Sequence, residues 1–287
     1  MKLYDSHAHL NEDTFTDAER AEFIEKIQVG IDSGLLSYVN DIGYDLKSSE
    51  LAAKHAALYP WCYAAVGCHP HDADNFSDEQ LAKIEELAKQ EKVVAIGEIG
   101  LDYHYDNSDR EAQKYWFRRQ IQLANHLHMP IVIHEREAAE DCMNILKEEG
   151  AFSAERKAFF PKRRGPVQED GSCEMLDDAR VLLHCFSGSA ELGRQYVKLG
   201  ATLSIAGPIT YKNARKTVEV AEQIPPEFLL VETDSPYLTP VPFRGQKNHP
   251  VNVRYTAEKV AEIKGLEPSK LAEITCKNAK IFFNIQG

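Results

Sequence analysis

Short apolar stretches rich in β-branched residues recur along the chain, and they alternate with longer segments of helical periodicity. Stretches of this kind, bounded by polar or glycine-containing segments, are typical of buried parallel strands. The eight predicted strands are Lys2–Ser6, Leu36–Ile42, Cys62–Gly67, Val93–Gly97, Pro130–Ile133, Val181–Leu183, Ala201–Ile205 and Phe228–Glu232. Eight strands separated by helices predict an α/β protein with a (β/α)8 TIM barrel. The alternative is an open doubly wound sheet, which would gather functional residues at one crevice.

Several helix boundaries can be predicted from local signals. Ser77–Gln80 has the pattern of a capping box, and Thr256 is a candidate N-cap of a later helix. The segment Glu191–Leu199 ends at Gly200, which suits a left-handed C-cap. A last helix is expected near Lys270–Phe283.

Length and composition indicate one globular unit. The chain has 287 residues, of which 43% are hydrophobic, so residues 1–287 are expected to form a single barrel domain. No apolar run reaches membrane-spanning length, and the N-terminus lacks a signal-peptide core, so we expect a cytoplasmic protein. None of the six cysteines forms a CxxC pair, which predicts free thiols.

The segment Gly150–Asp178 is longer than a helix-to-strand connection requires, and it predicts a surface insertion at about 150–178. One interpretation is a solvated excursion without a role at the site. The other is a lip that contacts a nucleic-acid backbone and stacks bases. Its candidate contacts are Arg156, Lys157, Phe159, Phe160, Lys162, Arg163 and Arg164. Loops of this class leave the barrel opposite the active site, so a lip would have to fold back a long way.

Six side chains of metal-binding type follow predicted strands, and these residues belong to five different strands. They are His7, His9, Glu98, His134, His184 and Asp234. Because the carboxyl ends of barrel strands meet at one face, we expect these side chains to converge there. Four imidazoles and two carboxylates can hold two divalent cations. Glu98 has two oxygens and is the candidate bridge between them.

Neighbouring residues suggest roles in catalysis and substrate binding. Asp234 and Glu98 are the candidate catalytic residues, with Asp234 accepting a proton from the attacking water. His69, Arg136 and Arg244 are candidates for substrate contact, although surface ion pairs would equally explain the two arginines.

Four more polar residues are expected to support the metal ligands. Asp5 either orients an imidazole or is simply a buried polar residue, and Glu232 is expected to be structural or to support a ligand. Asp102 and Tyr103 are candidates for supporting hydrogen bonds.

Competing chemistries lack their sequence motifs. The chain contains no GxSxG nucleophile elbow, no GxxxxGK[ST] phosphate loop and no GxGxxG after a strand. The net charge of −12 argues against a broad basic surface for nucleic acid. It leaves room for an enzyme that grips a few phosphates through bound metal ions.

Taken together, these motifs resemble those of the TatD family of metal-dependent deoxyribonucleases, within the amidohydrolase-like barrels. The matching pieces are DSHAHL, VGCHPH, GEIGLDYHYD, FRRQIQLANHLHMPIVIHERE, LLHCFSGS, ETDSPYL and RGQKNHP. The resemblance implies two divalent ions per subunit (Mg²⁺, Mn²⁺ or Zn²⁺), with Glu98 bridging. It also implies hydrolysis of DNA phosphodiesters, typically as a 3′→5′ exonuclease. Residues 150–178 depart from the family pattern, which usually has a shorter linker there.

Two other functions remain open from the sequence. The same site could hydrolyse another ester or amide, for example a D-aminoacyl-tRNA link, or the chain could be a binding protein on a degenerate barrel. The expected partner is DNA, single-stranded or bound by its end. Neither a membrane nor an obligate protein partner is indicated.

Overall fold

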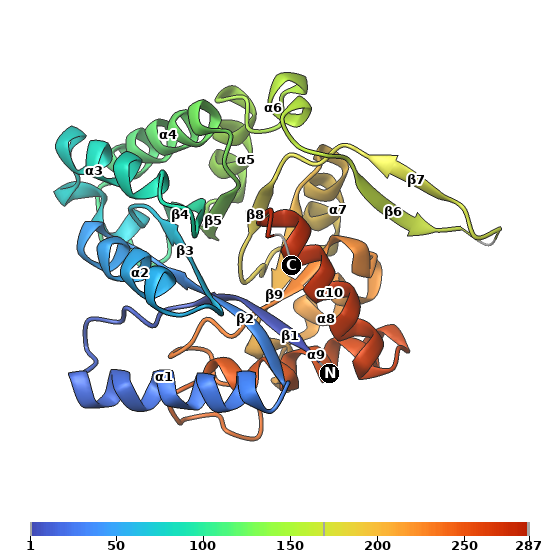
Figure 1. Ribbon diagram of the computed structural model, residues 1–287. Coiled ribbons are helices and arrows are strands. Elements are labelled where there is room, and N and C mark those ends of the chain that lie inside the picture. The colour runs from blue at the N-terminus through green and yellow to red at the C-terminus, as the bar shows by residue number, and fades with distance from the viewer. Residues whose placement is uncertain (1, 169, 286–287) are drawn as a thin grey trace.

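A computed structural model describes residues 2–168 and 170–285, and it contains an eight-stranded parallel barrel (Figure 1). Each neighbouring pair in the sheet order is parallel. The strands, in sheet order, are β1 (Leu3–Ala8), β2 (Leu36–Ile42), β3 (Cys62–Val66), β4 (Val93–Asp102), β5 (Ile131–Arg136), β8 (Val181–Leu183), β9 (Thr202–Ile205) and β10 (Leu229–Val231). All eight predicted strands are therefore confirmed.

The last strand returns to the first and nearly closes the barrel. The hydroxyl of Ser6 donates to the carbonyl of Val231 at 3.1 Å. Just beyond β10, the amide of Asp234 donates to the carbonyl of His7 at 2.9 Å, and the amide of His9 donates to that of Ser235 at 2.7 Å. This closure rules out the open sheet, and it places the segment after β10 beside the histidines of β1.

The barrel interior is filled by a compact apolar layer. Seven of the eight strands contribute to it, and the C-terminal end of the chain packs against the same cluster. The strand residues are Tyr4, Ile42, Ala65, Ala95, Val132, Leu182 and Leu230, joined by Phe282, Phe283 and Ile285. Because strand side chains alternate between faces, His134 lies on the same face as Val132, and Glu232 on the same face as Leu230. The apolar layer thus forms the floor beneath the polar site.

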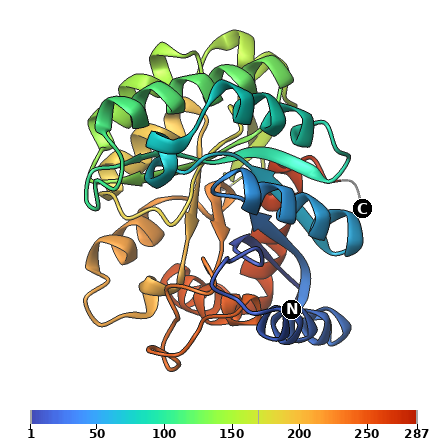
Figure 2. The same cartoon turned by 90° about the vertical axis from the view of Figure 1, so that its left-hand side faces the viewer.

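Helices surround the barrel on its outer side (Figure 2). A second, larger apolar cluster lies between them and the outward faces of the strands. The helices are α1 (Asp17–Asp32), α2 (Leu46–Leu58), α3 (Asp78–Ala88), α4 (Arg110–Leu127), α5 (Ala139–Glu148), α6 (Ala154–Ala158), α7 (Ala190–Leu199), α8 (Arg215–Gln223), α9 (Val253–Lys264) and α10 (Pro268–Phe282). Within the described part of the chain, none of them is long and apolar enough to cross a membrane. All six cysteines are free thiols, as predicted.

Most of the predicted helix ends are confirmed. Ser77 is the N-cap of α3, where its hydroxyl accepts from the amide of Gln80, but the reciprocal bond of the predicted capping box is not found among the described residues. Gly200 ends α7 in the left-handed conformation, with φ of 99°. The prediction for Thr256 is wrong, because this residue is fully buried inside α9. The turn at Pro250–Asn252 already sets helical geometry, so α9 begins at Val253, earlier than the sequence suggests.

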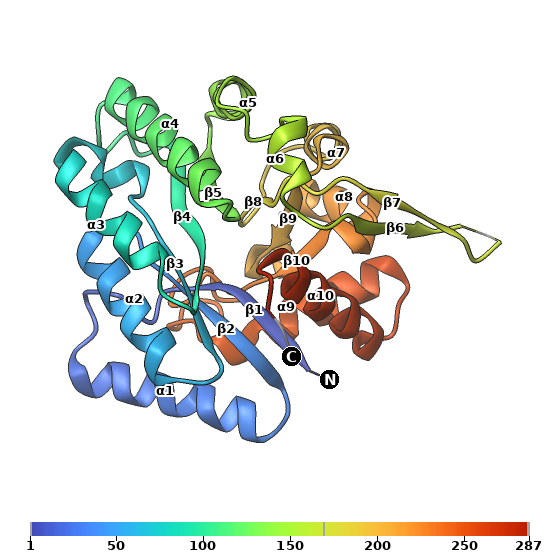
Figure 3. The same ribbon diagram turned by 45° about the horizontal axis from the view of Figure 1, so that its top comes forward.

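The insertion contains α6 and an antiparallel hairpin of β6 (Arg163–Val167) and β7 (Cys173–Leu176). The hairpin extends away from the barrel, as Figures 1 and 3 show. Two residues of the insertion that were predicted to contact nucleic acid, Arg156 in α6 and Arg163 in β6, are instead buried structural residues. The guanidinium of Arg156 donates to the carbonyls of Ala179 and Met129, both at 2.8 Å. That of Arg163 donates to the carbonyl of Ala201 at 2.7 Å.

These carbonyls precede β5, β8 and β9, so both arginines bind the amino-terminal end of the barrel. The metal-type residues lie at the opposite end. The lip interpretation is therefore wrong for Arg156 and Arg163, which tie the insertion to the frame of the barrel. The hairpin itself agrees with the other interpretation of the insertion, a solvated surface excursion.

Replacing Arg156 with alanine is expected to lower the free energy of unfolding by about 3 kcal/mol, because several buried backbone acceptors lose a charged donor. Urea denaturation would measure this loss. Arg164→Ala, on the exposed side of β6, is the matched control and should change stability by less than about 0.5 kcal/mol. Equal losses in the two variants would contradict the structural role of Arg156.

The loop that follows β10 contains a buried histidine held in its neutral form. His249 Nε2 donates to the carbonyl of Phe23 at 2.8 Å, and its Nδ1 accepts from the amide of Val251 at 3.4 Å. Both bonds are made by one neutral tautomer. Burial lowers the pKa of His249 from 6.5 to about 4.

Acid is therefore expected to destabilise the fold through His249. Between about pH 6.5 and pH 4 the unfolded chain binds this proton and the native protein does not, so stability is lost as the pH falls. From pH 7 to about pH 4.5, wild type should lose about 2 kcal/mol more than a His249→Gln variant. Denaturant titrations of both proteins at the two pH values test this. Parallel losses would show that His249 titrates normally in the native state.

Candidate metal centre

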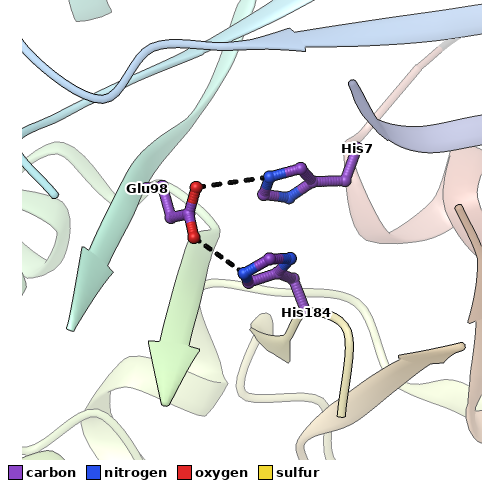
Figure 4. Close-up of side chains that lie close together, drawn as sticks. All are labelled: His7, Glu98 and His184. Carbon is purple, nitrogen blue, oxygen red and sulfur yellow. Dashed lines mark ion pairs between the residues drawn. The ribbon is translucent and has the colours of Figure 1, made fainter. Parts of the chain in front are cut away.

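The two carboxylate oxygens of Glu98 face two different groups of imidazoles. Glu98 lies within β4 and is only 3% exposed. Its Oε2 lies 3.3 Å from Nε2 of His7, and its Oε1 lies 2.7 Å from Nε2 of His184. Figure 4 shows these two contacts on opposite oxygens of the same side chain. Glu98 is thus positioned as a link between two clusters.

The first cluster joins the beginning and the end of the barrel. The Nε2 atoms of His7 and His9 lie 3.3 Å apart. Oδ1 of Asp234 lies 3.6 Å from Nε2 of His7 and 3.4 Å from that of His9. Together with Oε2 of Glu98, two nitrogens and two oxygens converge on one small volume. The His7, His9 and Asp234 atoms lie close enough together to ligate a single ion.

The second cluster surrounds the other oxygen of Glu98. Nδ1 of His134 lies 2.9 Å from Oε1, in addition to Nε2 of His184. His69, predicted as a substrate contact, also belongs here, with its Nε2 3.6 Å from Oε1. His69, Glu98 and His134 form a group of metal-binding geometry. The structure thus places a fifth imidazole beside the four predicted ligands.

Oxygen atoms behind the imidazoles fix the orientation of three rings. Nδ1 of His9 contacts the carbonyl of Ile42 at 2.8 Å, and Nδ1 of His184 contacts Glu232 at 3.3 Å. Nε2 of His134 contacts Asp102 at 3.0 Å. A ring that donates its outer N–H to such an oxygen presents the lone pair of its inner nitrogen to the cluster. These contacts give Glu232 and Asp102 supporting positions behind the candidate ligands.

The donor set fits divalent cations. Lone pairs of imidazoles and carboxylates facing one another at these distances repel unless positive charge lies between them. Burial opposes charge on His9, but Asp234 and Glu98 outweigh it and raise the pKa of His9 to about 9. Burial likewise opposes ionisation of Glu98, yet His184, His69 and His7 hold its pKa well below the usual value. The site therefore attracts positive charge, and nitrogen and oxygen donors of this kind suit Zn²⁺, Mn²⁺ and related ions.

Two of the four predicted supporting residues lie apart from the imidazoles. Asp5 accepts from the amide and the hydroxyl of Thr233 at 2.9 and 2.5 Å, so it is a buried polar residue that fixes the segment before Asp234. The hydroxyl of Tyr103 donates to Asp141 at 2.6 Å on the outer side of β4. Within the described part of the chain, neither side chain forms a hydrogen bond with a histidine ring.

The clusters lie at the bottom of an open cavity of about 760 Å³. Arg136, at the end of β5, lines it, and its guanidinium lies 4.6 Å from the ring centre of Tyr105. Arg244 does not reach the cavity, because its side chain is exposed and lies over Tyr211 at 4.4 Å. Of the two arginines predicted to contact substrate, the structure brings only Arg136 to the site.

The cavity wall also contains residues that sequence reasoning did not single out. Tyr44 and Tyr237 stand beside His9, and Glu12 and Asp13 line the same side. Tyr237 lies within the SPYL piece and Glu12 directly follows DSHAHLN, so both are near recognisable motifs. Neither has a residue type or spacing that reveals its position in space.

Comparisons with known proteins show the family of this chain. The family model for the TatD related DNases matches residues 4–284. The uncharacterized metal-dependent hydrolase YabD of Bacillus subtilis is 42% identical, over 99% of this chain and 99% of that protein. The uncharacterized metal-dependent hydrolase TatD of Mycobacterium tuberculosis is 32% identical, over 97% of this chain and 96% of its own.

Solved structures show the same barrel. The crystal structure of YJJV, a TatD homolog from Escherichia coli K12, matches with a TM-score of 0.81 and 26% identity, covering 99% of this chain and 98% of that one. A TatD family hydrolase from Entamoeba histolytica has the same fold, with a TM-score of 0.78, 22% identity and coverage of 98% and 97%. The chain therefore belongs to the TatD family of metal-dependent hydrolases.

Proposed function

We propose that this protein is a deoxyribonuclease that uses two divalent ions to remove nucleotides from the 3′ end of DNA. The observation that carries the proposal is the buried Glu98 carboxylate, whose two oxygens face separate ligand clusters in an open cavity. Two-metal sites that share one carboxylate are suited to in-line displacement at phosphorus. The family description, TatD related DNase, supports the same substrate class.

The residues sort into two ligand sets. His7, His9 and Asp234 would hold one ion with Oε2 of Glu98, and His134 and His184 would hold the other with Oε1. When bound, such ions supply Lewis-acid activation of the attacking water and stabilise charge on the phosphodiester oxygens. The mixed nitrogen and oxygen donors suit Mn²⁺ or Zn²⁺, and Mg²⁺ is the ion that phosphoryl-transfer sites commonly use.

The charge of the cavity explains why such an enzyme would depend on metal. Apart from histidines, Arg136 is the one cationic side chain among the described residues that line the cavity. The carboxylates of the lining are those of Glu12, Asp13, Asp72, Glu98, Asp102, Glu135 and Asp234. Without bound cations, this wall would repel a phosphodiester.

To Asp234 we assign the role of accepting the proton of the attacking water. It lines the cavity, and its side chain keeps 15% of its surface exposed while its Oδ1 contacts His9. Burial opposes ionisation, but hydrogen bonding with His9 and the charges of His7 and His184 lower the pKa of Asp234. The carboxylate is therefore ionised at neutral pH and available as a base. Arg136, at the rim, can contact a phosphate of the same substrate.

The first test is hydrolysis by the purified protein. With Mn²⁺ or Mg²⁺ we expect it to release 5′-mononucleotides from the 3′ end of single-stranded DNA, and a chelator should abolish this activity. Asp234→Asn should lower kcat by at least about 100-fold, because it removes the base and a ligand. RNA and D-aminoacyl-tRNA are assayed in parallel. Metal-loaded protein that deacylates the tRNA and leaves DNA intact would replace the proposal with the ester-hydrolase alternative.

A second test measures metal binding without reference to activity. Glu98→Gln should bind less than half as much Mn²⁺ or Zn²⁺ per chain as wild type, because both ligand sets lose their shared anion. Elemental analysis after dialysis gives the content. Glu148→Gln, which alters an exposed ion pair with Arg118, is the control and should retain the wild-type content. Unchanged metal content in Glu98→Gln would exclude Glu98 as the bridge.

A further inference from the structure

Three tyrosine rings surround the cavity above the metal-type residues. Tyr105 and Tyr237 are 54% and 51% exposed, which is unusual for large aromatic side chains, and Tyr44 is half-buried. All three line the cavity. They come from distant parts of the chain, following β2, β4 and β10. Exposed aromatic rings at a nucleolytic cavity are suited to stacking on nucleobases.

Two of these rings are held in place beside His9. The hydroxyl of Tyr237 donates to Oε2 of Glu12 at 2.5 Å, and that of Tyr44 accepts from the amide of Asp13 at 3.3 Å. Their ring centres lie 6.1 and 5.8 Å from that of His9, in edge-to-face orientation. These hydroxyl contacts limit the rotation of both rings. A base that stacks there therefore loses less free energy to ordering of the protein.

The charge around the cavity differs between its two sides. Beside Tyr44 and Tyr237 the lining residues Glu12 and Asp13 are acidic, and the described residues that line this side include no lysine or arginine. On the other side Arg136 lies over Tyr105, and the two carboxylates nearby are already engaged, Asp102 with His134 and Glu135 with the amide of Ala138. A polyanionic strand can therefore continue past Arg136 but not past Glu12 and Asp13.

At a 3′-hydroxyl end the terminal nucleoside carries no phosphate beyond its sugar. This nucleoside can therefore lie beside Glu12 and Asp13 without placing a phosphate there. Its 3′-hydroxyl can donate a hydrogen bond to a carboxylate. We propose that Tyr237 and Tyr44 bind the base of the 3′-terminal nucleotide, and that Tyr105 and Arg136 hold the strand leading towards its 5′ end. This assignment rests on the proposed nuclease function and adds the means by which the site recognises a free end.

The assignment also accounts for repeated cleavage. Water attacks the terminal phosphorus, the bond between phosphorus and the 3′-oxygen of the preceding nucleotide breaks, and that oxygen takes up a proton. The products are a 5′-mononucleotide and a strand one nucleotide shorter. The new end again carries a 3′-hydroxyl, so it fits the same acidic side in the next cycle.

The base contact is tested with two single-stranded oligonucleotides that differ only in the last residue, one normal and one abasic. For wild type, loss of the terminal base should lower kcat/KM by about 5- to 100-fold. Tyr237→Ala should lose a similar factor on the normal strand and little more on the abasic one. Tyr115→Ala, at an exposed tyrosine on the outer face of α4, is the control and should match wild type on both strands.

The charge contact is tested with a 3′-phosphorylated strand. Wild type should cleave it at least about tenfold more slowly than the 3′-hydroxyl strand. Asp13→Asn should reduce this discrimination by about twofold to fivefold, because one repelling charge is removed. Asp17→Asn, an exposed residue in the first turn of α1, should leave it unchanged.

The outcomes separate the two levels of the proposal. If wild type releases nucleotides from 3′ ends but treats abasic and normal ends alike, or cleaves 3′-phosphate and 3′-hydroxyl ends equally, the end-recognition assignment is overturned and the nuclease function stands. If wild type with metal hydrolyses none of these strands, the proposed function fails and the assignment fails with it.

Discussion

The site depends on one costly arrangement, the burial of the Glu98 carboxylate in the interior of a barrel. An isolated ionised carboxylate would be strongly destabilised there. It is tolerated because imidazoles from β1, β5 and the end of β8 surround both of its oxygens. This compensation requires the barrel to close, since His7 comes from the first strand and Asp234 from the segment after the last. The hydrogen bonds between these two segments therefore stabilise the fold and assemble the ligand set at the same time.

Buried charged groups have different kinds of partner at the two ends of the barrel. At the amino-terminal end, the guanidinium groups of Arg156 and Arg163 donate to backbone carbonyls, an asparagine side chain and a threonine hydroxyl. At the carboxyl-terminal end, imidazoles and carboxylates contact mainly one another and leave inner lone pairs without a fixed donor. The first arrangement is met largely by acceptors of the protein itself, whereas the second has the geometry of candidate metal-binding groups. This difference is the physical reason why the insertion ties the frame together at the first end, while the second end is the candidate metal centre.

Much of the frame could be predicted from the sequence, because apolar β-branched runs determine which segments are buried. The predicted strands at residues 93–97 and 130–133 nevertheless ended too early, since β4 continues to Asp102 and β5 to Arg136. The polar ends of β4 and β5 pair with each other as far as Asp102 and Arg136. Their side chains contact residues from other strands of the barrel, which the local sequence does not show. The hairpin β6–β7 escaped prediction for a related reason, since its strands alternate little and bury few side chains.

The candidate metal ligands were predictable because each follows an apolar strand, and parallel strands bring their ends together. Tyr44 and Tyr237 were not, because their position beside His9 depends on how loops far apart in the sequence fold over the barrel end. The position of Arg244 could not be predicted for the same reason, since its loop places it over Tyr211 and outside the described lining of the cavity.

Charge explains how a protein with a net charge of −12 and an acidic cavity could act on a polyanion. Each bound divalent ion adds two positive charges at the floor of the cavity, directly among the carboxylates that would otherwise repel a phosphate. The long-range field of the protein still disfavours the strand, so attraction is confined to the few phosphates nearest the ions. A site of this kind gains little binding free energy from the middle of a long duplex. It gains most from a single strand end that fits inside the cavity. The acidic surroundings, unfavourable for nucleic-acid binding in general, are therefore compatible with the proposed enzyme that works on strand ends.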